Sequence, residues 1–116
     1  MPAKLSTHVL DLTSGRPAEG IKIDLWRRDG SSSPARLKHV ATNRDGRIDA
    51  PLLEGAELKA GSYELVFHVR EYFAAHGVDG GFLDEVPIRF NVTDATASYH
   101  VPLLVTPWSY STYRGS

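Results

Sequence analysis

The sequence has 116 residues, of which 41% are hydrophobic and 23% are charged, and its formal net charge is -1. This length and composition fit one globular domain, so we expect residues 1–116 to form a single domain. The 13 basic residues are scattered along a chain of almost zero net charge, which argues against a nucleic-acid partner. The chain has no cysteine, which excludes a disulfide framework, a thiolate nucleophile and a cysteine zinc site.

Two kinds of apolar segment are missing from the sequence. Residues 1–8 lack the apolar run of a signal peptide, and no stretch approaches the roughly 20 apolar residues of a membrane span. We therefore expect no membrane partner and a cytoplasmic location.

Apolar and polar residues alternate through much of the chain, which is the pattern of half-buried β-strands. Ile21, Ile23 and Leu25 give the first clear example. Turn-forming residues separate these segments, so the pattern predicts an all-β antiparallel sandwich. In chain order, the expected strands cover residues 5–12, 21–28, 37–42, 48–53, 62–69, 86–92, 99–105 and 108–114.

One segment and one residue depart from the alternation. Residues 69–77 contain helix formers, apolar residues at Val69, Tyr72 and Phe73, and a glycine at the end, which predicts one short α-helix. Pro102 lies inside an expected strand, and because proline has no N–H to donate, it must lie at an edge or a bulge.

Two histidines occupy the polar positions of expected strands. His8 lies between Thr7 and Val9, and His100 lies between Tyr99 and Val101. Neighbouring side chains of a strand point to opposite faces, so both histidine rings should project from the face opposite the core. Apolar side chains share that face with them, and such a mixed surface is typical of a site or an interface. The alternative is that both are ordinary solvated histidines.

Arg47 follows the turn at residues 43–46 and opens an expected strand. A guanidinium held there offers a planar donor fork for a carbonyl oxygen or a developing oxyanion. The alternative is a surface ion pair with Asp45 or Asp49.

No cofactor or metal site is expected. His39, His68 and His76 show no short ligand spacing with an acidic residue. Asp24, Glu64 and Asp84 lack a paired context for acid–base chemistry, so we expect them on solvated faces.

The chain ends in Tyr113, Arg114, Gly115 and Ser116. These residues add a phenol, a guanidinium, a hydroxyl and the terminal carboxylate to a strand rich in tyrosine, serine and threonine. Chain ends are frayed unless something holds them, so we expect this end to be ordered and to form one wall of an active site.

Four segments carry a resemblance to a known family. Residues 5–11, 43–47, 99–107 and 110–116 resemble those of the transthyretin-related 5-hydroxyisourate hydrolases, and the similarity spans essentially the whole chain. The terminal Tyr-Arg-Gly-Ser is the specific part, because other segments are also close to the thyroid-hormone carrier transthyretin. That carrier has a lysine at the position of His8, no histidine at that of His100, and a different C-terminus, so the differences favour the hydrolase.

The resemblance implies a transthyretin-like antiparallel sandwich of two four-stranded sheets with one short α-helix. It also implies a homotetramer with active sites in the channel between dimers. The reaction it implies hydrolyses the N1–C6 amide of 5-hydroxyisourate to give 2-oxo-4-hydroxy-4-carboxy-5-ureidoimidazoline, a step of urate degradation, without a cofactor.

The resemblance also assigns roles to residues. The implied catalytic residues are His8, Arg47, His100 and Ser116, and the implied substrate contacts are His8, Arg47, Tyr113 and Arg114. An imidazole has a pKa near 6.5, so either histidine could be the general base, and the sequence leaves that choice open. Ser116 is expected to take part in a hydrogen-bond relay rather than to act as a nucleophile.

Two functions of other classes remain open at this point. A transthyretin-type carrier would bind a small ligand without turnover, and a structural module would bind a protein partner through a sheet edge.

Overall fold

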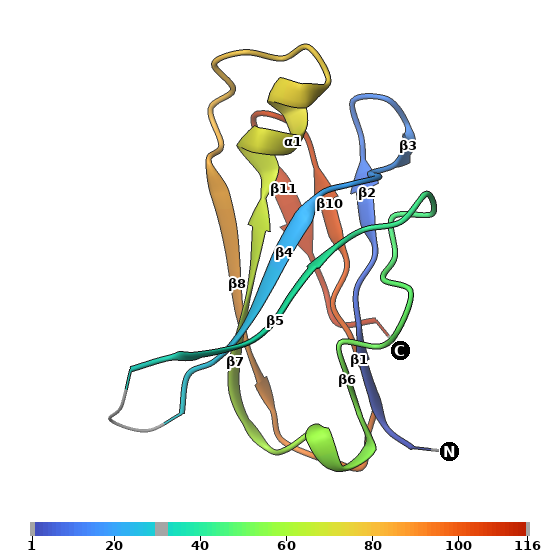
Figure 1. Ribbon diagram of the computed structural model, residues 1–116, viewed down its shortest axis with the longest axis vertical. Coiled ribbons are helices and arrows are strands. Elements are labelled where there is room, and N and C mark those ends of the chain that lie inside the picture. The colour runs from blue at the N-terminus through green and yellow to red at the C-terminus, as the bar shows by residue number, and fades with distance from the viewer. Residues whose placement is uncertain (1, 30–32, 116) are drawn as a thin grey trace.

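The computed structural model describes residues 2–29 and 33–115, which form a β-sandwich with one short α-helix at one end (Figure 1). One layer contains β4 (Lys22–Arg27), β5 (Ala35–Ala41), β7 (Gly61–His68) and β8 (Glu85–Val92). The other layer contains β1 (Lys4–Ser6), β2 (Val9–Asp11), β3 (Arg16–Pro17), β6 (Leu53–Glu54), β9 (Tyr99–His100), β10 (Leu103–Val105) and β11 (Tyr110–Thr112). The helix is α1 (Val69–Ala75), and a 3-10 turn, η1, covers Gly55–Glu57.

The first layer is a fully antiparallel sheet in the order β5-β4-β7-β8. Its inward residues form pairs across the strands, such as Ile23 opposite Phe67 and Leu65 opposite Ile88. These side chains join Leu5 and Leu103 of the other layer in one hydrophobic core. Burial of this alternating apolar face is the main force that holds the two layers together.

The second layer differs from the expected single four-stranded sheet. The expected strands 5–12 and 99–105 are each interrupted, which leaves a three-stranded sheet β6-β1-β9 and a four-stranded sheet β11-β10-β2-β3. Pro102 lies at the interruption and has no N–H for the ladder, and the Thr7 hydroxyl donates to the Val101 carbonyl at 2.7 Å. The Thr7 hydroxyl thus bonds to the Val101 carbonyl, which would accept from a backbone N–H if the strand pairing were continuous.

The two central pairings of this layer are parallel, not antiparallel as predicted. Leu5 pairs with Tyr99 in one sheet, and Val9 pairs with Leu103 in the other. The two segments therefore keep the same pairing register on both sides of the interruption. Segments far apart in the chain therefore lie side by side, which brings Ser6 next to His100.

Two expected strands are shorter than predicted. Segment 48–53 contributes only β6, since Pro51 cannot donate to a ladder. Segment 108–114 contributes β11, which begins after a turn in which the Thr106 hydroxyl accepts from the N–H groups of Trp108 and Ser109.

Helix α1 confirms the prediction for residues 69–77. Val69, Tyr72 and Phe73 are its buried residues, and Gly77 follows the helix with a φ of 86°. A left-handed conformation at this point favours glycine. Among the described residues, no helix is both long enough and apolar enough to cross a membrane.

Candidate functional site

The turn at residues 43–47 brings Arg47 close to β2. Its shape is held by Asn43, whose side-chain oxygen accepts from the N–H groups of Asp45 and Arg47 at 2.9 and 3.2 Å. Gly46 has a φ of 74° and its carbonyl accepts from the Val9 N–H at 2.8 Å. A Cβ on Gly46 would collide with the Val9 carbonyl oxygen, so the turn requires glycine here.

His8 lies in the interruption between β1 and β2, where its half-buried ring meets that turn. Its Nε2 atom lies 2.9 Å from the main-chain oxygen of Asp45. A carbonyl oxygen can only accept a hydrogen bond, so Nε2 must be the donor. In the neutral imidazole, Nδ1 is then the nitrogen with the free lone pair.

His100 lies on β9 and is the more enclosed of the two candidate histidines. Its Nδ1 atom is 2.9 Å from the Ser6 hydroxyl oxygen, across a sequence separation of 94 residues. Burial lowers the pKa of His100 below its usual value, and the positive charge of Arg47 and that of His8 when His8 is protonated lower it further. A lowered pKa favours the neutral form of the His100 imidazole.

A polar cavity of about 420 Å³ lies beside these groups. Its lining residues are Lys4, Ser6, Arg47, Ser98, Tyr99 and His100. The residues around the cavity thus include an imidazole, two cations, two serines and a tyrosine. This combination can accept a proton and stabilise a developing negative charge.

The C-terminal segment closes over β9. The Arg114 guanidinium stacks on the Tyr99 ring at 4.2 Å and donates to the Ser98 carbonyl at 3.3 Å. Gly115 pairs with His100, and its N–H donates to the His100 carbonyl at 2.7 Å. These contacts hold the described part of the segment against β9, in agreement with the expectation that something holds this end of the chain.

The structure brings some predicted site residues together and not others. Arg47 and His100 line one cavity, and His8, which is not among its lining residues, contacts the turn that carries Arg47. Tyr113 is 59% exposed and lines a different cavity, of about 250 Å³, with Arg114. The Arg114 guanidinium is engaged with Tyr99. Ser116 lies outside the described residues.

Lys4, Ser6, Ser98 and Tyr99 line the cavity, but none of them was assigned a role in the site from the sequence. Ser6 had a usable signal, since it lies two residues before His8 and on the same face of the expected strand. Lys4 and Ser98 had none, because their place depends on how β1 pairs with β9.

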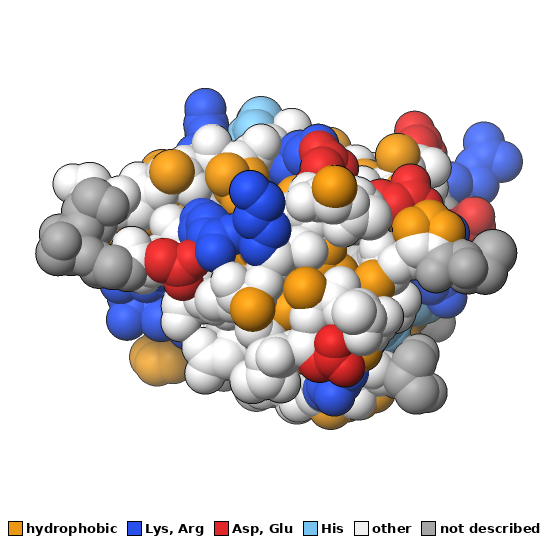
Figure 2. Space-filling view, turned by 90° about the horizontal axis from the view of Figure 1, so that it is seen from below, with side chains coloured by type: hydrophobic (Ala, Val, Ile, Leu, Met, Phe, Trp, Pro, Cys, Tyr) orange, Lys and Arg blue, Asp and Glu red, His pale blue; other side chains and the backbone are white. Residues whose placement is uncertain are grey.

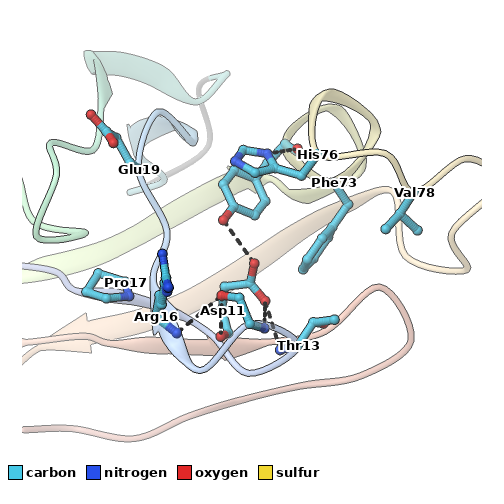
Figure 3. A pocket seen from close by; sticks show the side chains of 10 residues that line it. Asp11, Thr13, Arg16, Pro17, Glu19, Phe73, His76 and Val78 are labelled. Carbon is cyan, nitrogen blue, oxygen red and sulfur yellow. Dashed lines mark hydrogen bonds between the residues drawn. The ribbon is translucent and has the colours of Figure 1, made fainter.

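A larger cavity, of about 590 Å³, lies between α1 and the turn that follows β2 (Figure 3). Figure 3 shows the Asp11 carboxylate at its centre, where it accepts from the Tyr72 hydroxyl at 3.0 Å and from the Thr13 N–H at 2.8 Å. Burial and the Asp11 carboxylate raise the pKa of Tyr72. These polar groups satisfy one another and fasten α1 to β2, so this cavity is not the candidate site.

Two acidic residues expected on solvated faces are buried instead. Asp24 is 7% exposed, and its carboxylate lies 2.5 Å from His39 Nδ1 and 2.7 Å from His68 Nε2. Glu64 is 9% exposed and accepts from Arg89 at 2.8 Å. The sequence did not reveal these partners because they lie on neighbouring strands.

The charges on the surface are mixed. In the view from below, Lys and Arg side chains alternate with Asp and Glu, and they form no continuous basic stripe on the part of this face that the structure describes (Figure 2).

These features describe a two-layer β-sandwich with a polar site built from two imidazoles and a guanidinium. Residues 5–115 match the sequence profile of the HIUase/transthyretin family, and the chain belongs to this family. It is 54% identical to a 5-hydroxyisourate hydrolase 2 of Rhizobium meliloti, over 97% of this chain and 96% of that protein.

Two solved structures show the same architecture. The 5-hydroxyisourate hydrolase of Klebsiella pneumoniae superposes with a TM-score of 0.84 and 36% identity, covering 98% of this chain and 99% of that one. Transthyretin from Sparus aurata superposes with a TM-score of 0.89 at 22% identity, covering 97% of each chain. The second likeness shows the fold alone, which confirms the transthyretin-like sandwich.

Proposed function

We propose that this chain is a 5-hydroxyisourate hydrolase that opens the six-membered ring of its substrate at the N1–C6 amide. Relatives with this activity in their names cover nearly the full chain at about half identity. The observation that carries the proposal is the placement of His100, a neutral imidazole, beside Arg47 in one polar cavity. The fold alone would not decide, because a transthyretin shares it.

The proposed reaction uses the two histidines together. His100 Nε2 and His8 Nδ1 position a water molecule, and His100 takes its proton as the oxygen attacks C6. The Arg47 guanidinium stabilises the negative charge that develops on the C6 carbonyl oxygen. The imidazolium then returns the proton to N1 as the C6–N1 bond breaks, which leaves a new carboxyl group on C6.

The C-terminal residues complete the proposed site. Ser116 takes part in the hydrogen-bond relay, and Tyr113 and Arg114 help to orient the flat, polar ring. Arg114 does so through its stacking on Tyr99, next to the cavity. A covalent acyl-enzyme on Ser116, trapped and found by mass spectrometry, would contradict this role.

The assembly in the proposal is a homotetramer with sites at the channel between dimers. Leu12 and Trp108 are 53% and 62% exposed, next to β2 and β10, and Leu10 pairs with Leu104 across these strands on the outer face. A second copy would remove this apolar surface from water. Tyr113 is exposed in one chain and would reach substrate in the assembly. Light scattering that shows a fully active monomer would contradict the proposed tetramer.

A cytoplasmic location is part of the same proposal.

The deciding experiment is a spectrophotometric assay. Urate oxidase generates 5-hydroxyisourate from urate in the cuvette, and the protein should speed the loss of its near-ultraviolet absorbance. His8→Ala, Arg47→Ala and His100→Ala should each lower turnover by roughly 10² to 10⁴ while the circular dichroism spectrum stays unchanged. No acceleration over spontaneous decay would favour a carrier, and near-native turnover of one variant would remove that residue from the site.

A further inference from the structure

Two residues that are not assigned to catalysis, Ser6 and Gly115, hold His100 through three contacts. Ser6 contacts its Nδ1 atom at 2.9 Å, and the Gly115 N–H donates to its carbonyl oxygen at 2.7 Å. In residues 2–29 and 33–115, no group hydrogen-bonds to its Nε2 atom. These contacts fix the residue while they leave one ring nitrogen available to substrate.

The third contact is the close approach of Gly115 to the ring. A Cβ on Gly115 would stand 2.6 Å from His100 Cδ2, 3.2 Å from Cγ and 3.1 Å from Cβ. An imidazole is rigid, so a methyl group here would force the ring or the C-terminal segment to move. Gly115 does not have a positive φ, so its backbone would accept alanine and the ring alone excludes it.

We infer that Ser6 and Gly115 are positioning residues that hold the His100 imidazole with Nε2 as its reactive nitrogen, an inference that rests on the proposed hydrolysis. A serine hydroxyl can donate to Nδ1 or accept from it, and in this inference Ser6 accepts the Nδ1 proton of the neutral ring, so that the lone pair is on Nε2. Gly115 lets the C-terminal segment close against the ring, so that the ring cannot rotate away. The glycine of the terminal Tyr-Arg-Gly-Ser thus acts through His100.

The test uses Ser6→Ala, Ser6→Thr and Gly115→Ala in the full-length protein. Loss of one hydrogen bond to the ring should lower kcat about 10-fold in Ser6→Ala, and Ser6→Thr should recover most of that loss because it keeps a hydroxyl. Displacement of the ring in Gly115→Ala should lower kcat about 10²-fold. KM should change by less than about 3-fold in each variant, since substrate binding is not what they remove.

A matched control is Gly81→Ala. Gly81 also lacks a positive φ, and its Cβ would lie 3.3 Å from the Pro107 Cβ and 3.5 Å from the Pro107 carbonyl oxygen, with no atom as close as the His100 ring is to Gly115. It does not line the cavity around His100. This variant should keep the kcat of the unaltered protein.

NMR of ring-labelled histidine provides a readout that does not depend on turnover. The His100 ring nitrogen shifts should report a changed tautomer balance in Ser6→Ala, and the Cδ2–H signal should move in Gly115→Ala. The control variant Gly81→Ala should leave both signals in place, which ties the shifts to the contacts that Ser6 and Gly115 make with the ring.

The possible outcomes are distinct. Unshifted His100 signals in Gly115→Ala and Ser6→Ala, or kcat values equal to that of the unaltered protein, would overturn the inference. Shifted signals together with a fall in kcat support it. If the unaltered protein failed to hydrolyse 5-hydroxyisourate, the proposed function would fall, and with it the assignment of a reactive Nε2, whatever the NMR shows of the ring contacts.

Discussion

The Nε2 atom of His8 donates to the main-chain oxygen of Asp45 at 2.9 Å, and this contact sets the tautomer of the first candidate base. The proton of the neutral ring is on Nε2, so only Nδ1 can accept a hydrogen bond from water. The turn that carries Asp45 also carries Arg47, and the same hydrogen bonds therefore place the imidazole and the guanidinium relative to each other.

The first prediction tests whether His8 acts through Nδ1 or only braces the turn. In His8→Gln the side-chain amide can still donate to Asp45 but offers no basic nitrogen. We therefore expect it to lose turnover as severely as His8→Ala, by roughly 10² to 10⁴. Steady-state kinetics measures this, with His76→Gln as a control outside the cavity. Recovery of native kcat by glutamine would reduce His8 to a support for the turn.

The second prediction concerns the pH dependence of kcat/KM. Burial, Arg47 and His8 lower the pKa of His100, so the acid limb of the profile should lie below the usual imidazole value of about 6.5. Arg47→Gln removes a positive charge that disfavours the imidazolium, so its acid limb should move to higher pH, at reduced activity. Arg44→Gln changes a nearby charge in the same turn and should leave the limb in place. An Arg47→Gln profile shifted to lower pH would contradict the electrostatic argument.

Much of the fold follows from local sequence pattern, and the exceptions have identifiable causes. The apolar residues of β4, β7 and β8 alternate along one buried face of each strand, and this alternation predicts the three strands directly. The break between β1 and β2 was missed because it lies opposite Pro102, which separates the partner strands β9 and β10. A single-strand pattern carries no information about the partner.

The candidate site was predictable in part for the same reason. His8 and His100 could be placed on outward faces, and Arg47 at the end of a turn, from local signals alone. The contact between Ser6 and His100 joins positions 94 residues apart through a parallel pairing, which no local pattern reveals. The burial of Asp24 was missed likewise, because its histidine partners lie on β5 and at the end of β7.

The third prediction concerns stability in acid. Burial opposes ionisation of Asp24, but hydrogen bonds from His68 and His39 outweigh it, so the pKa of this carboxyl is lowered in the folded protein. A carboxyl with a lowered folded pKa stabilises the protein above its unfolded pKa, near 3.9, and this contribution disappears as the pH falls through the folded value. Asp24→Asn should therefore cost about 1–3 kcal/mol at pH 7, and the difference should shrink in acid.

Denaturant unfolding at one fixed protein concentration measures that difference at each pH. The exposed Asp79 gives a matched control, and Asp79→Asn should change stability little at any pH. A constant difference between Asp24→Asn and the unaltered protein down to strongly acidic pH would show that the carboxylate charge is not responsible.

The fourth prediction is that hydrolysis needs no metal ion. The proposed mechanism takes its base from His100 and its charge stabilisation from Arg47, so dialysis against EDTA should leave kcat unchanged. Loss of activity in EDTA that zinc restores would replace this mechanism with a metal-bound hydroxide.

The last prediction concerns the C-terminus, whose residues should be needed for turnover but not for folding of the sandwich. The core is complete by Val105, so deletion of residues 113–116 should leave a folded sandwich. The deletion removes the stacking of Arg114 on Tyr99, an exposed contact whose loss should cost about 0.5–1 kcal/mol. It also removes Gly115 from the His100 ring and Ser116 from the relay, so turnover should be abolished. Circular dichroism and the hydrolysis assay, run on the same sample, measure the two effects.

Tags at the two ends of the chain extend this argument. A bulky tag after Ser116 begins two residues beyond Gly115, which packs against His100. It should therefore crowd the site and impair turnover. The same tag before Met1 should be milder, because the cavity lining on the N-terminal side begins only at Lys4. A carrier or a structural module gives no reason for such an asymmetry in a turnover assay. Full activity of the protein that lacks residues 113–116 would remove the C-terminal segment from the mechanism, and with it the role assigned to Gly115.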